Sequence, residues 1–186
     1  MTLKEKVLQI RKELKAAGFT TKQVSVIGKN ALYDESINIR IKDLEANKEK
    51  IQNIVMKYES IRYDEYNGEI LNGCNTYVHV EIDYNLLLLA RKDFIEKSND
   101  ILEKSKEECG HNELHTVYED DKQIIFYQPH YSNGNPPTIS LSEIKPLEYE
   151  GKIYNSYDTI KRNIATHSEN IAEFLVLCKY QYNCNI

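Results

Sequence analysis

The residues that could bind a metal gather at one place, where Cys109, His111 and His115 follow one another with the spacing Cys-x-His-x3-His. Thiolate and imidazole are ligands that zinc prefers, and a structural zinc site needs four of them in a tetrahedral arrangement. The fourth would have to come from a distant position, Cys178 or Cys184. No standard zinc finger has this spacing, so we interpret the segment as an ordinary polar loop and expect no metal or other cofactor.

Motifs for other kinds of catalysis are missing from the sequence. A nucleophilic Cys or Ser needs a neighbouring His, but the five histidines are scattered and no G-x-S-x-G segment occurs. Neither phosphate-binding glycine motif is present, and Gly68 and Gly73 are more simply explained as turn residues. A site assembled in space from distant residues stays open. We therefore predict a protein without enzymatic activity and assign no catalytic residues.

Three consecutive carboxylates, Glu119, Asp120 and Asp121, form the densest acidic run, in a predicted hairpin turn. Such a turn is usually solvated, but it could also present negative charge to a protein groove that normally binds phosphate. The chain has a formal net charge of −5 at pH 7, and residues 84–186 account for all of it. This excess of acid disfavours non-specific binding to nucleic acid and suits a basic protein partner.

Basic side chains that could hold phosphate occur first near the N-terminus. The capping box Thr2-x-x-Glu5 marks the start of a helix, and Gly18 is a natural stop for it. Lys12 and Lys15 lie on the exposed face of this predicted helix. A solvated face is the simpler interpretation, and contact with phosphate or an acidic protein surface is the alternative.

A second basic site could lie near the C-terminus, in residues 148–175, where the pattern predicts a short hairpin followed by two helices. This segment is similar to small DNA-binding modules of phage homing nucleases, which carry the hairpin pattern Tyr-x-Gly-x-x-Tyr-x-Ser. The matching residues are Tyr149, Gly151, Tyr154 and Ser156. Lys161 and Arg162 would then lie on the first of the two helices. Few basic side chains accompany the pattern, so a simple packing hairpin is favoured.

The composition places the chain among globular proteins. Its 186 residues are 41% hydrophobic and 28% charged, which is enough for one domain or two small ones. The longest apolar run, residues 86–90, is far shorter than the ~20 residues that cross a bilayer, and the N-terminus lacks the apolar core of a signal peptide. We expect a cytoplasmic protein, with its four cysteines as free thiols.

The hydrophobic pattern of residues 1–83 predicts the order helix–strand–strand twice. Helices are expected at 2–17 and 44–58, and strands at 23–27, 36–42, 61–66 and 76–83. Two such repeats build a four-stranded antiparallel sheet with both helices on one face, an αββαββ arrangement of the α+β class. Tyr77, His79 and Glu81 alternate with apolar residues, so they should share the opposite sheet face, which is either solvated or covered.

Residues 84–186 are predicted to form a mixed α/β region. We expect a helix at 84–108, a hairpin of 114–119 and 123–128, a second hairpin of 147–149 and 152–154, and helices at 156–165 and 168–180. A boundary is placed near residue 84, between a domain at 1–83 and this region at 84–186. No linker rich in Gly, Pro and Ser separates the two parts, so they could share one core.

Residues 5–83 resemble the domains associated with large polyvalent proteins of phages and mobile elements. The resemblance is carried by residues 10–15, 24–26, 36–39, 54–55, 58, 68–73 and 75–78. The family's second strand usually ends in a pattern like Trp-Thr-Asp-Gly, where this chain has Ile41-Lys42-Asp43. No catalytic residue of the family carries over to this sequence.

Members of this family are encoded in phages, plasmids and anti-defence islands, and the resemblance therefore implies a counter-defence protein. The resemblance implies an anti-CRISPR protein that binds and inhibits a Cas9-type effector nuclease or its guide-RNA complex by obstructing DNA or guide RNA. The expected partner contacts are Tyr77, His79, Glu81, Glu119, Asp120 and Asp121. The alternative is a DNA- or RNA-binding accessory protein of a mobile element. It would use Lys12, Lys15, Lys161 and Arg162.

Overall fold

The computed structural model describes residues 1–107, 114–129, 135–149 and 152–186. The chain divides into two compact units, Met1–Leu86 and Leu87–Ile186. Each unit contains helices and a sheet of its own, so the predicted α+β class is confirmed. No described helix is both long enough and apolar enough to span a bilayer.

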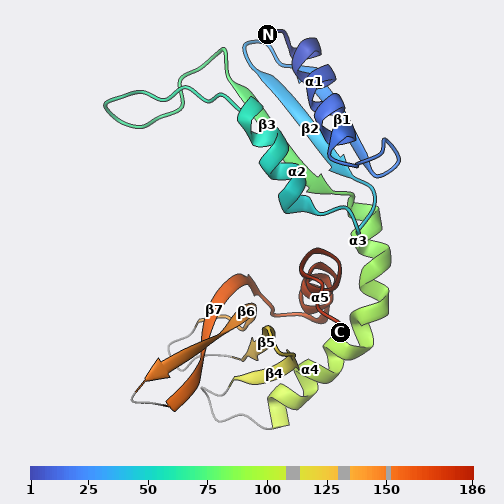
Figure 1. Cartoon of the computed structure of the whole chain (residues 1–186), viewed down its shortest axis with the longest axis vertical. Coiled ribbons are helices and arrows are strands. Elements are labelled where there is room, and N and C mark those ends of the chain that lie inside the picture. Colours follow the sequence, from blue (N-terminus) through green and yellow to red (C-terminus); the bar gives the residue numbers. More distant parts are fainter. Residues whose placement is uncertain (108–113, 130–134, 150–151) are drawn as a thin grey trace. The chain divides into compact units, whose positions relative to one another are not determined.

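The first unit is a three-stranded sheet with two helices (Figure 1). Its elements in order are α1 (Leu3–Ala16), β1 (Val24–Asn30), β2 (Glu35–Ile41), α2 (Lys48–Val55), the 3-10 turn η1 (Met56–Tyr58) and β3 (Thr76–Ile82). The strands lie in the order β1-β2-β3, with β1 antiparallel to β2 and β2 parallel to β3.

Local signals explain where α1 begins and which face it buries. Thr2 and Glu5 form the predicted capping box, since each side chain accepts a hydrogen bond from the other residue's backbone N–H. The apolar residues recur at helical spacing and are buried in one stripe. They are Leu3, Val7, Ile10 and Leu14.

One face of the sheet forms the core of the first unit against both helices. Alternate residues of the strands point to this face, as the period of a strand requires. The buried strand residues are Val24, Val26, Ile37, Ile39, Ile41, Val78 and Val80. They pack in one cluster with the apolar stripes of α1 and α2, so both helices cover the same face, as predicted.

The predicted four-stranded antiparallel sheet is wrong in two respects. Residues 61–66 form no strand, because the chain there turns back on itself and makes only the isolated bridges Ser60–Thr76 and Tyr63–Ile70. In addition, β3 pairs with β2 in parallel. The helix α2 returns the chain to the end of the sheet where β2 began, and a strand that follows such a crossover runs parallel to its predecessor.

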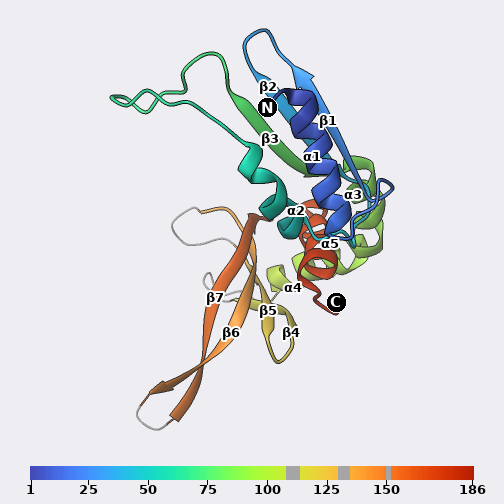
Figure 2. The same cartoon turned by 45° about the horizontal axis from the view of Figure 1, so that its top comes forward.

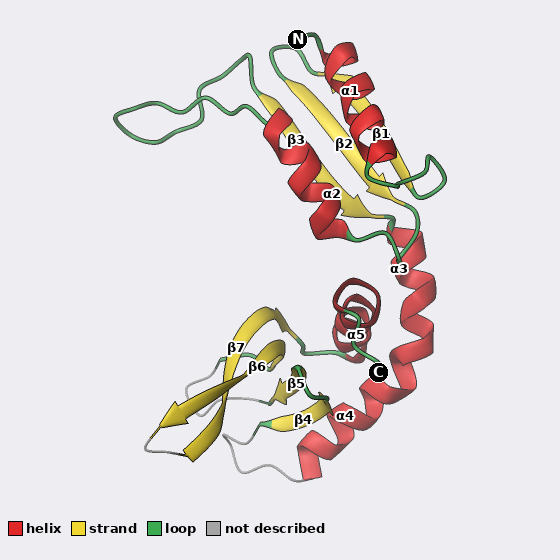
Figure 3. Cartoon of the chain, viewed as in Figure 1, coloured by secondary structure: helices red, strands yellow, loops and turns green. Residues whose placement is uncertain are grey.

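The second unit is an antiparallel sheet flanked by helices (Figure 3). It contains α3 (Tyr84–Arg91), which begins just before the point where the units divide, η2 (Lys92–Phe94), α4 (Ile95–Glu107), β4 (His115–Glu119), β5 (Gln123–Gln128), β6 (Thr138–Tyr149), β7 (Lys152–Ile164) and α5 (Ser168–Tyr182). The strand order is β4-β5-β6-β7, with each strand antiparallel to the next.

The core of the second unit centres on α5. This helix buries Ile171, Phe174 and Leu175, and its neighbours in the core come from the middle of the sheet and from η2. The buried partners are Phe94, Ile125, Tyr127, Ile139 and Leu141. The predicted helix at 168–180 is confirmed as α5, and the predicted hairpin of 114–119 and 123–128 as β4 and β5.

The predicted helix at 156–165 is wrong, because these residues belong to β7. The segment is rich in β-branched and aromatic residues, among them Tyr157, Thr159 and Ile160, which favour an extended chain beside a partner strand. Pairing with β6 runs along the whole of β7, from Lys152 to Ile164. The second predicted hairpin therefore exists but is several times longer than expected.

Candidate functional site

Three rows of side chains cross the sheet face of the first unit that α1 and α2 leave uncovered. The register places Lys29, Ser36 and Tyr77 in one row, Ile27, Asn38 and His79 in the next, and Ser25, Arg40 and Glu81 in the third. The three predicted contact residues of β3 thus lie side by side on one face, and each has a polar or basic neighbour on β2. We call these nine residues the open face.

Two rings of the open face stack on each other. The centroids of Tyr77 and His79 are 6.4 Å apart and the ring planes differ by 13°. His79 is exposed and Tyr77 half-buried, while Arg40 lies one row away with its guanidinium 3.8 Å from the Asp83 carboxylate. Rings beside a cation on a flat sheet can stack with the bases of a single-stranded nucleic acid.

A hairpin-like connection, residues 59–75, projects from the end of the same sheet (Figure 3). We call it the finger. Asp64 organises its tip, because its carboxylate accepts the backbone N–H groups of Tyr66 and Asn67 and its carbonyl accepts that of Gly68. The Tyr66 side chain at this tip is 99% exposed. The finger thus presents an aromatic ring that makes no contribution to a core.

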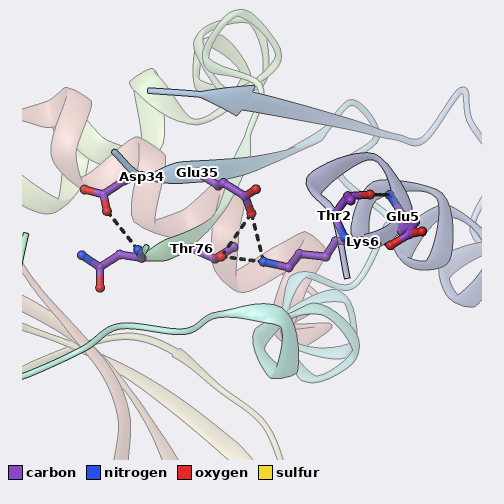
Figure 4. Close-up of polar contacts among 7 residues, drawn as sticks. Thr2, Glu5, Lys6, Asp34, Glu35 and Thr76 are labelled. Atoms are coloured by element: carbon purple, nitrogen blue, oxygen red, sulfur yellow. Dashed lines mark hydrogen bonds and ion pairs between the residues drawn. The ribbon is translucent and has the colours of Figure 1, made fainter. Parts of the chain in front are cut away.

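Buried polar side chains fix the base of the finger. The Asn75 amide accepts the backbone N–H of Arg62 at 2.8 Å and donates to the Leu71 carbonyl at 2.7 Å, while its own backbone N–H donates to Asp34 at 2.9 Å. Next to it, the Lys6 ammonium donates to Glu35 Oε2 at 3.0 Å and to Thr76 Oγ1 at 2.7 Å (Figure 4).

This polar cluster has a structural role. It ties α1, β2 and β3 together at the point where the finger leaves the sheet, and every named oxygen has a donor. A cavity of about 410 Å³ lies beside it and is bordered by Cys74, whose backbone has a φ of 61°. No histidine is found among the described residues that line this cavity.

The hairpin of β6 and β7 carries several exposed apolar residues of the second unit, among them Leu147, Ile153 and Tyr157. β5 pairs with β6 only as far as Glu143, and from there the two strands continue alone to Tyr149 and Lys152 (Figure 2). We call residues 143–149 and 152–158 the arm. Because β7 is also the edge strand of the sheet, much of its length is exposed.

The pleat of the arm separates its side chains into two faces. Tyr157 contacts Phe126 of β5 edge to face, with ring centroids 5.4 Å apart. Alternate residues share a face, so Ile144, Pro146 and Ile153 lie on the same face as Tyr157, where Asn155 is opposite Pro146 and Glu148 is opposite Ile153. Ile153 is 77% exposed and Tyr157 46%. We call the apolar residues of this face, Ile144, Pro146, Ile153 and Tyr157 with Phe126 of β5, the apolar face of the arm.

The opposite face of the arm is more polar. It carries Leu147 and Tyr154 beside an ion-pair network in which the Lys145 ammonium lies 2.6 Å from Asp158 and 3.4 Å from Glu143. These carboxylates raise the pKa of Lys145, so it remains charged at neutral pH. The Lys145–Asp158 pair joins the two strands of the arm and so fixes their register.

The acidic turn predicted as a contact site joins β4 to β5. All three carboxylate residues are exposed, but the Asp120 carboxylate also accepts hydrogen bonds from the Tyr118 hydroxyl and from the backbone N–H groups of Lys122 and Gln123. The hydrogen bond from Tyr118, helped by those backbone donors, lowers the pKa of Asp120. Asp120 therefore holds the turn, and the other two carboxylates face solvent.

The four predicted phosphate-binding residues are divided between the two units. Lys12 and Lys15 are exposed on α1 of the first unit. Lys161 and Arg162 lie on β7 of the second unit and not on the predicted helix. As consecutive residues of a strand, they point to opposite faces of the sheet, which separates their charges.

Two buried cysteines meet at the C-terminal end of α5. Cys178 donates a hydrogen bond to the sulfur of Cys184, and this bond and burial raise the pKa of Cys178 and keep it protonated. The same bond lowers the pKa of Cys184, whose thiol donates to Gln123 Oε1 at 3.2 Å. Both are free thiols that pack in the core.

The segment considered for zinc binding lies partly outside the described residues. Cys109 and His111 are not among them, while His115 begins β4. Within the described parts of the chain, no three His, Cys, Asp or Glu side chains are grouped so that they could hold a metal ion.

Sequence reasoning missed the arm and the finger as exposed surfaces. The signal for the arm was present, because residues 153–160 combine isoleucine, tyrosine and threonine with no strong helix former. For the finger, the pairs Asn67-Gly68 and Asn72-Gly73 marked two turns close together, which is typical of a connection between elements.

Comparison with known proteins gives no relative: no family model, no curated protein and no solved structure matches this chain. The resemblance to polyvalent-protein domains therefore stays a prediction from the sequence.

Proposed function

We propose that this protein is a non-enzymatic binding protein that docks on another macromolecule through the apolar face of the arm. We further propose that the partner is a Cas9-type CRISPR effector nuclease or its guide-RNA complex, which the protein inhibits. The observation that carries the first part is the stripe of Ile144, Pro146, Ile153 and Tyr157 on two strands that extend past the rest of their sheet.

Exposed apolar side chains that share one face have a cost in water that binding relieves. Scattered apolar residues are normal on a protein surface, whereas contiguous ones mark interaction sites. Tyrosine is enriched among the residues that dominate binding energies, where truncation costs about 2 kcal/mol or more. Tyr157 is partly ordered by Phe126, so it would lose little conformational freedom on binding.

The choice of partner rests on charge and on the sequence resemblance. The net charge of −5 falls on residues 84–186, which include the arm. A nuclease that holds nucleic acid in a positively charged channel attracts an acidic protein, because the charges of the two surfaces are complementary. The resemblance to domains of phage and mobile-element proteins supplies the biological setting. Exposed Glu119 and Asp121 would add to this attraction.

The proposal is tested by a cleavage assay with a purified Cas9–guide complex, to which the protein is added in increasing amounts. We expect cleavage to be lost near a one-to-one ratio of protein to effector. Binding of the protein to free DNA is measured in parallel and should be absent. If the protein neither binds the effector nor slows cleavage, this partner is wrong.

A matched pair of variants locates the contact on the arm. Tyr157→Ser removes a ring from the apolar face, and Tyr154→Ser removes a ring of similar exposure, 48% against 46%, from the opposite face of the same strand. We expect the first to weaken effector binding about tenfold or more and the second to change it less than about threefold. Equal effects of the two variants would show that the apolar face is not the contact.

The second candidate function is binding of single-stranded DNA or RNA by the open face, which the stacked Tyr77 and His79 favour. It predicts salt-dependent binding of a fluorescent oligonucleotide, because phosphates release counterions when they meet cations. Tyr77→Ala should abolish base stacking, and Arg40→Gln should reduce the dependence on salt. Absence of binding at low salt would remove this candidate.

A further inference from the structure

A groove on the first unit lies outside every surface described so far. It runs between the C-terminal half of α1 and the neighbouring strand β1, and its volume is about 500 Å³. Its lining is mainly apolar and includes Leu8, Leu14, Phe19, Val24 and Val26. Leu8 is 56% exposed although it belongs to a helix whose other apolar residues are buried.

The packing of α1 explains why the groove opens at this end of the helix. A Cβ atom built on Gly28 would lie 2.9 Å from side-chain atoms of Leu3 and Val7, so the N-terminal half of α1 approaches β1 very closely. Farther along, valines replace this glycine on β1, and their side chains occupy the space between the strand and the helix. The helix therefore stands farther from the strand there.

The charges around the groove have one sign. Among the described residues that line it, the charged ones are Arg11, Lys12 and Lys15, with no Asp or Glu. Three cations beside an apolar cavity attract a ligand that combines an apolar part with negative charge. The first unit as a whole is balanced in charge, so this concentration of positive charge is local.

The floor of the groove is the free edge of the sheet. β1 is an edge strand, and in an antiparallel pair every second residue directs its N–H and C=O away from the partner strand. Val26 is such a residue, because its carbonyl accepts a hydrogen bond of 2.6 Å from the Arg11 guanidinium. By the same alternation, the backbone groups of Gly28 also point away from β2.

From these observations we infer that the groove binds an extended peptide segment with apolar and acidic side chains, which adds to the sheet as a strand beside β1. The peptide backbone pairs with Val26 and Gly28, its apolar side chains enter the cavity beside Leu8, and its carboxylates meet the lysines of α1. Strand addition at a sheet edge next to a helix is a general mode of peptide recognition.

Arg11 has a defined part in this binding. In the free protein its guanidinium covers the Val26 carbonyl and so blocks the edge against non-specific pairing. When a peptide N–H takes that place, Arg11 is released and pairs with a carboxylate of the peptide, which makes a stronger bond because both partners are then charged. An acidic peptide is therefore favoured over a neutral one by more than long-range attraction.

The inference is independent of the proposed function, since it uses α1 and β1 and none of the arm. It is tested by selection of random peptides of about 12 residues, displayed on phage, against the full chain. We expect enriched peptides that contain both acidic and apolar residues. The synthesised peptides should shift the backbone amide NMR signals of Val26 and Gly28. Failure to enrich any peptide, or shifts confined to other residues, would overturn the inference.

Two controls separate strand addition from simple charge attraction. Methylation of alternate backbone nitrogens of the peptide should reduce its affinity about tenfold or more, because it removes the donors to β1. The double variant with Lys12→Glu and Lys15→Glu should reduce the affinity by a similar factor. The matched control, with Lys4→Glu and Lys22→Glu, changes the net charge of the protein equally but outside the groove. It should leave the affinity within about twofold of the parent protein.

A lipid-like ligand is the competing occupant of an apolar cavity with a basic rim. Dodecanoate is therefore added as a competitor in the same NMR experiment. We expect the peptide to remain bound and the shifts at Val26 and Gly28 to persist. If dodecanoate fills the cavity and displaces the peptide, or if the methylated peptide binds as well as the unmodified one, the groove is not a peptide site.

Discussion

The hydroxyl of Tyr58 donates a hydrogen bond of 2.9 Å to the carboxylate of Glu13 and joins η1 to α1 across 45 positions of the sequence. The Lys57 ammonium lies 2.9 Å from the other oxygen of the same carboxylate. Burial and the bond to Glu13 raise the pKa of Tyr58 to about 12. Burial acts to raise the pKa of Glu13, but hydrogen bonds from Lys57, Gln9 and Tyr58 outweigh it and lower that pKa.

This contact predicts a loss of stability in acid. Because the pKa of Glu13 is below its ordinary value of 4.5 in the folded state, its contribution is complete above pH 4.5 and is lost as the pH falls through the lower, folded value. Urea unfolding of Glu13→Gln should show less stability than the parent protein at neutral pH and a smaller further loss on acidification. Glu45→Gln, an exposed carboxylate, should behave like the parent protein.

The close approach of α1 to β1 predicts that Gly28 tolerates no side chain. Gly28→Ala places a methyl group 2.9 Å from Leu3 and Val7, so α1 must shift and the free energy of unfolding should fall by about 1–3 kcal/mol. Ser25→Ala, on the opposite face of the same strand, serves as the control and should change stability by less than about 0.5 kcal/mol. Equal stability of Gly28→Ala and the parent would contradict the packing described.

The acidic turn predicts that neighbouring carboxylates differ in their effect on stability. Asp120→Ala removes the acceptor of two backbone N–H groups and should cost about 1 kcal/mol in thermal or urea unfolding. Asp121→Ala removes the same charge from an exposed position and should cost almost nothing. If instead both variants keep full stability while effector binding falls, the turn acts through its charge.

The cysteines predict selective chemical labelling. Cys74 is exposed and should react with a thiol reagent in the native protein, whereas buried Cys178 and Cys184 should react only after unfolding. Mass spectrometry of the labelled peptides, in a Cys109→Ser background, distinguishes the three positions. Rapid native labelling of Cys178 would show that the C-terminal end of α5 opens readily, and the core assigned to it would be wrong.

The sequence alone determined the elements whose signals are local. A capping box and a stripe of apolar residues at helical spacing define α1, and strict alternation defines β2 and β3. The common face of Tyr77, His79 and Glu81 follows from the same alternation. These patterns need only the geometry of one helix or one strand, so they can be recognised without knowing the neighbouring elements.

Only the tertiary structure decided which strands pair, and in which direction. The parallel pairing of β2 and β3 depends on the crossover of the chain through α2, and the length of the hairpin depends on how far β6 and β7 pair with each other. The groove beside Val26 likewise depends on the distance between α1 and β1, which Gly28 sets from a position outside the groove lining. Strand pairing and the spacing between a helix and a strand depend on contacts between elements distant in sequence, so no local sequence pattern predicts them.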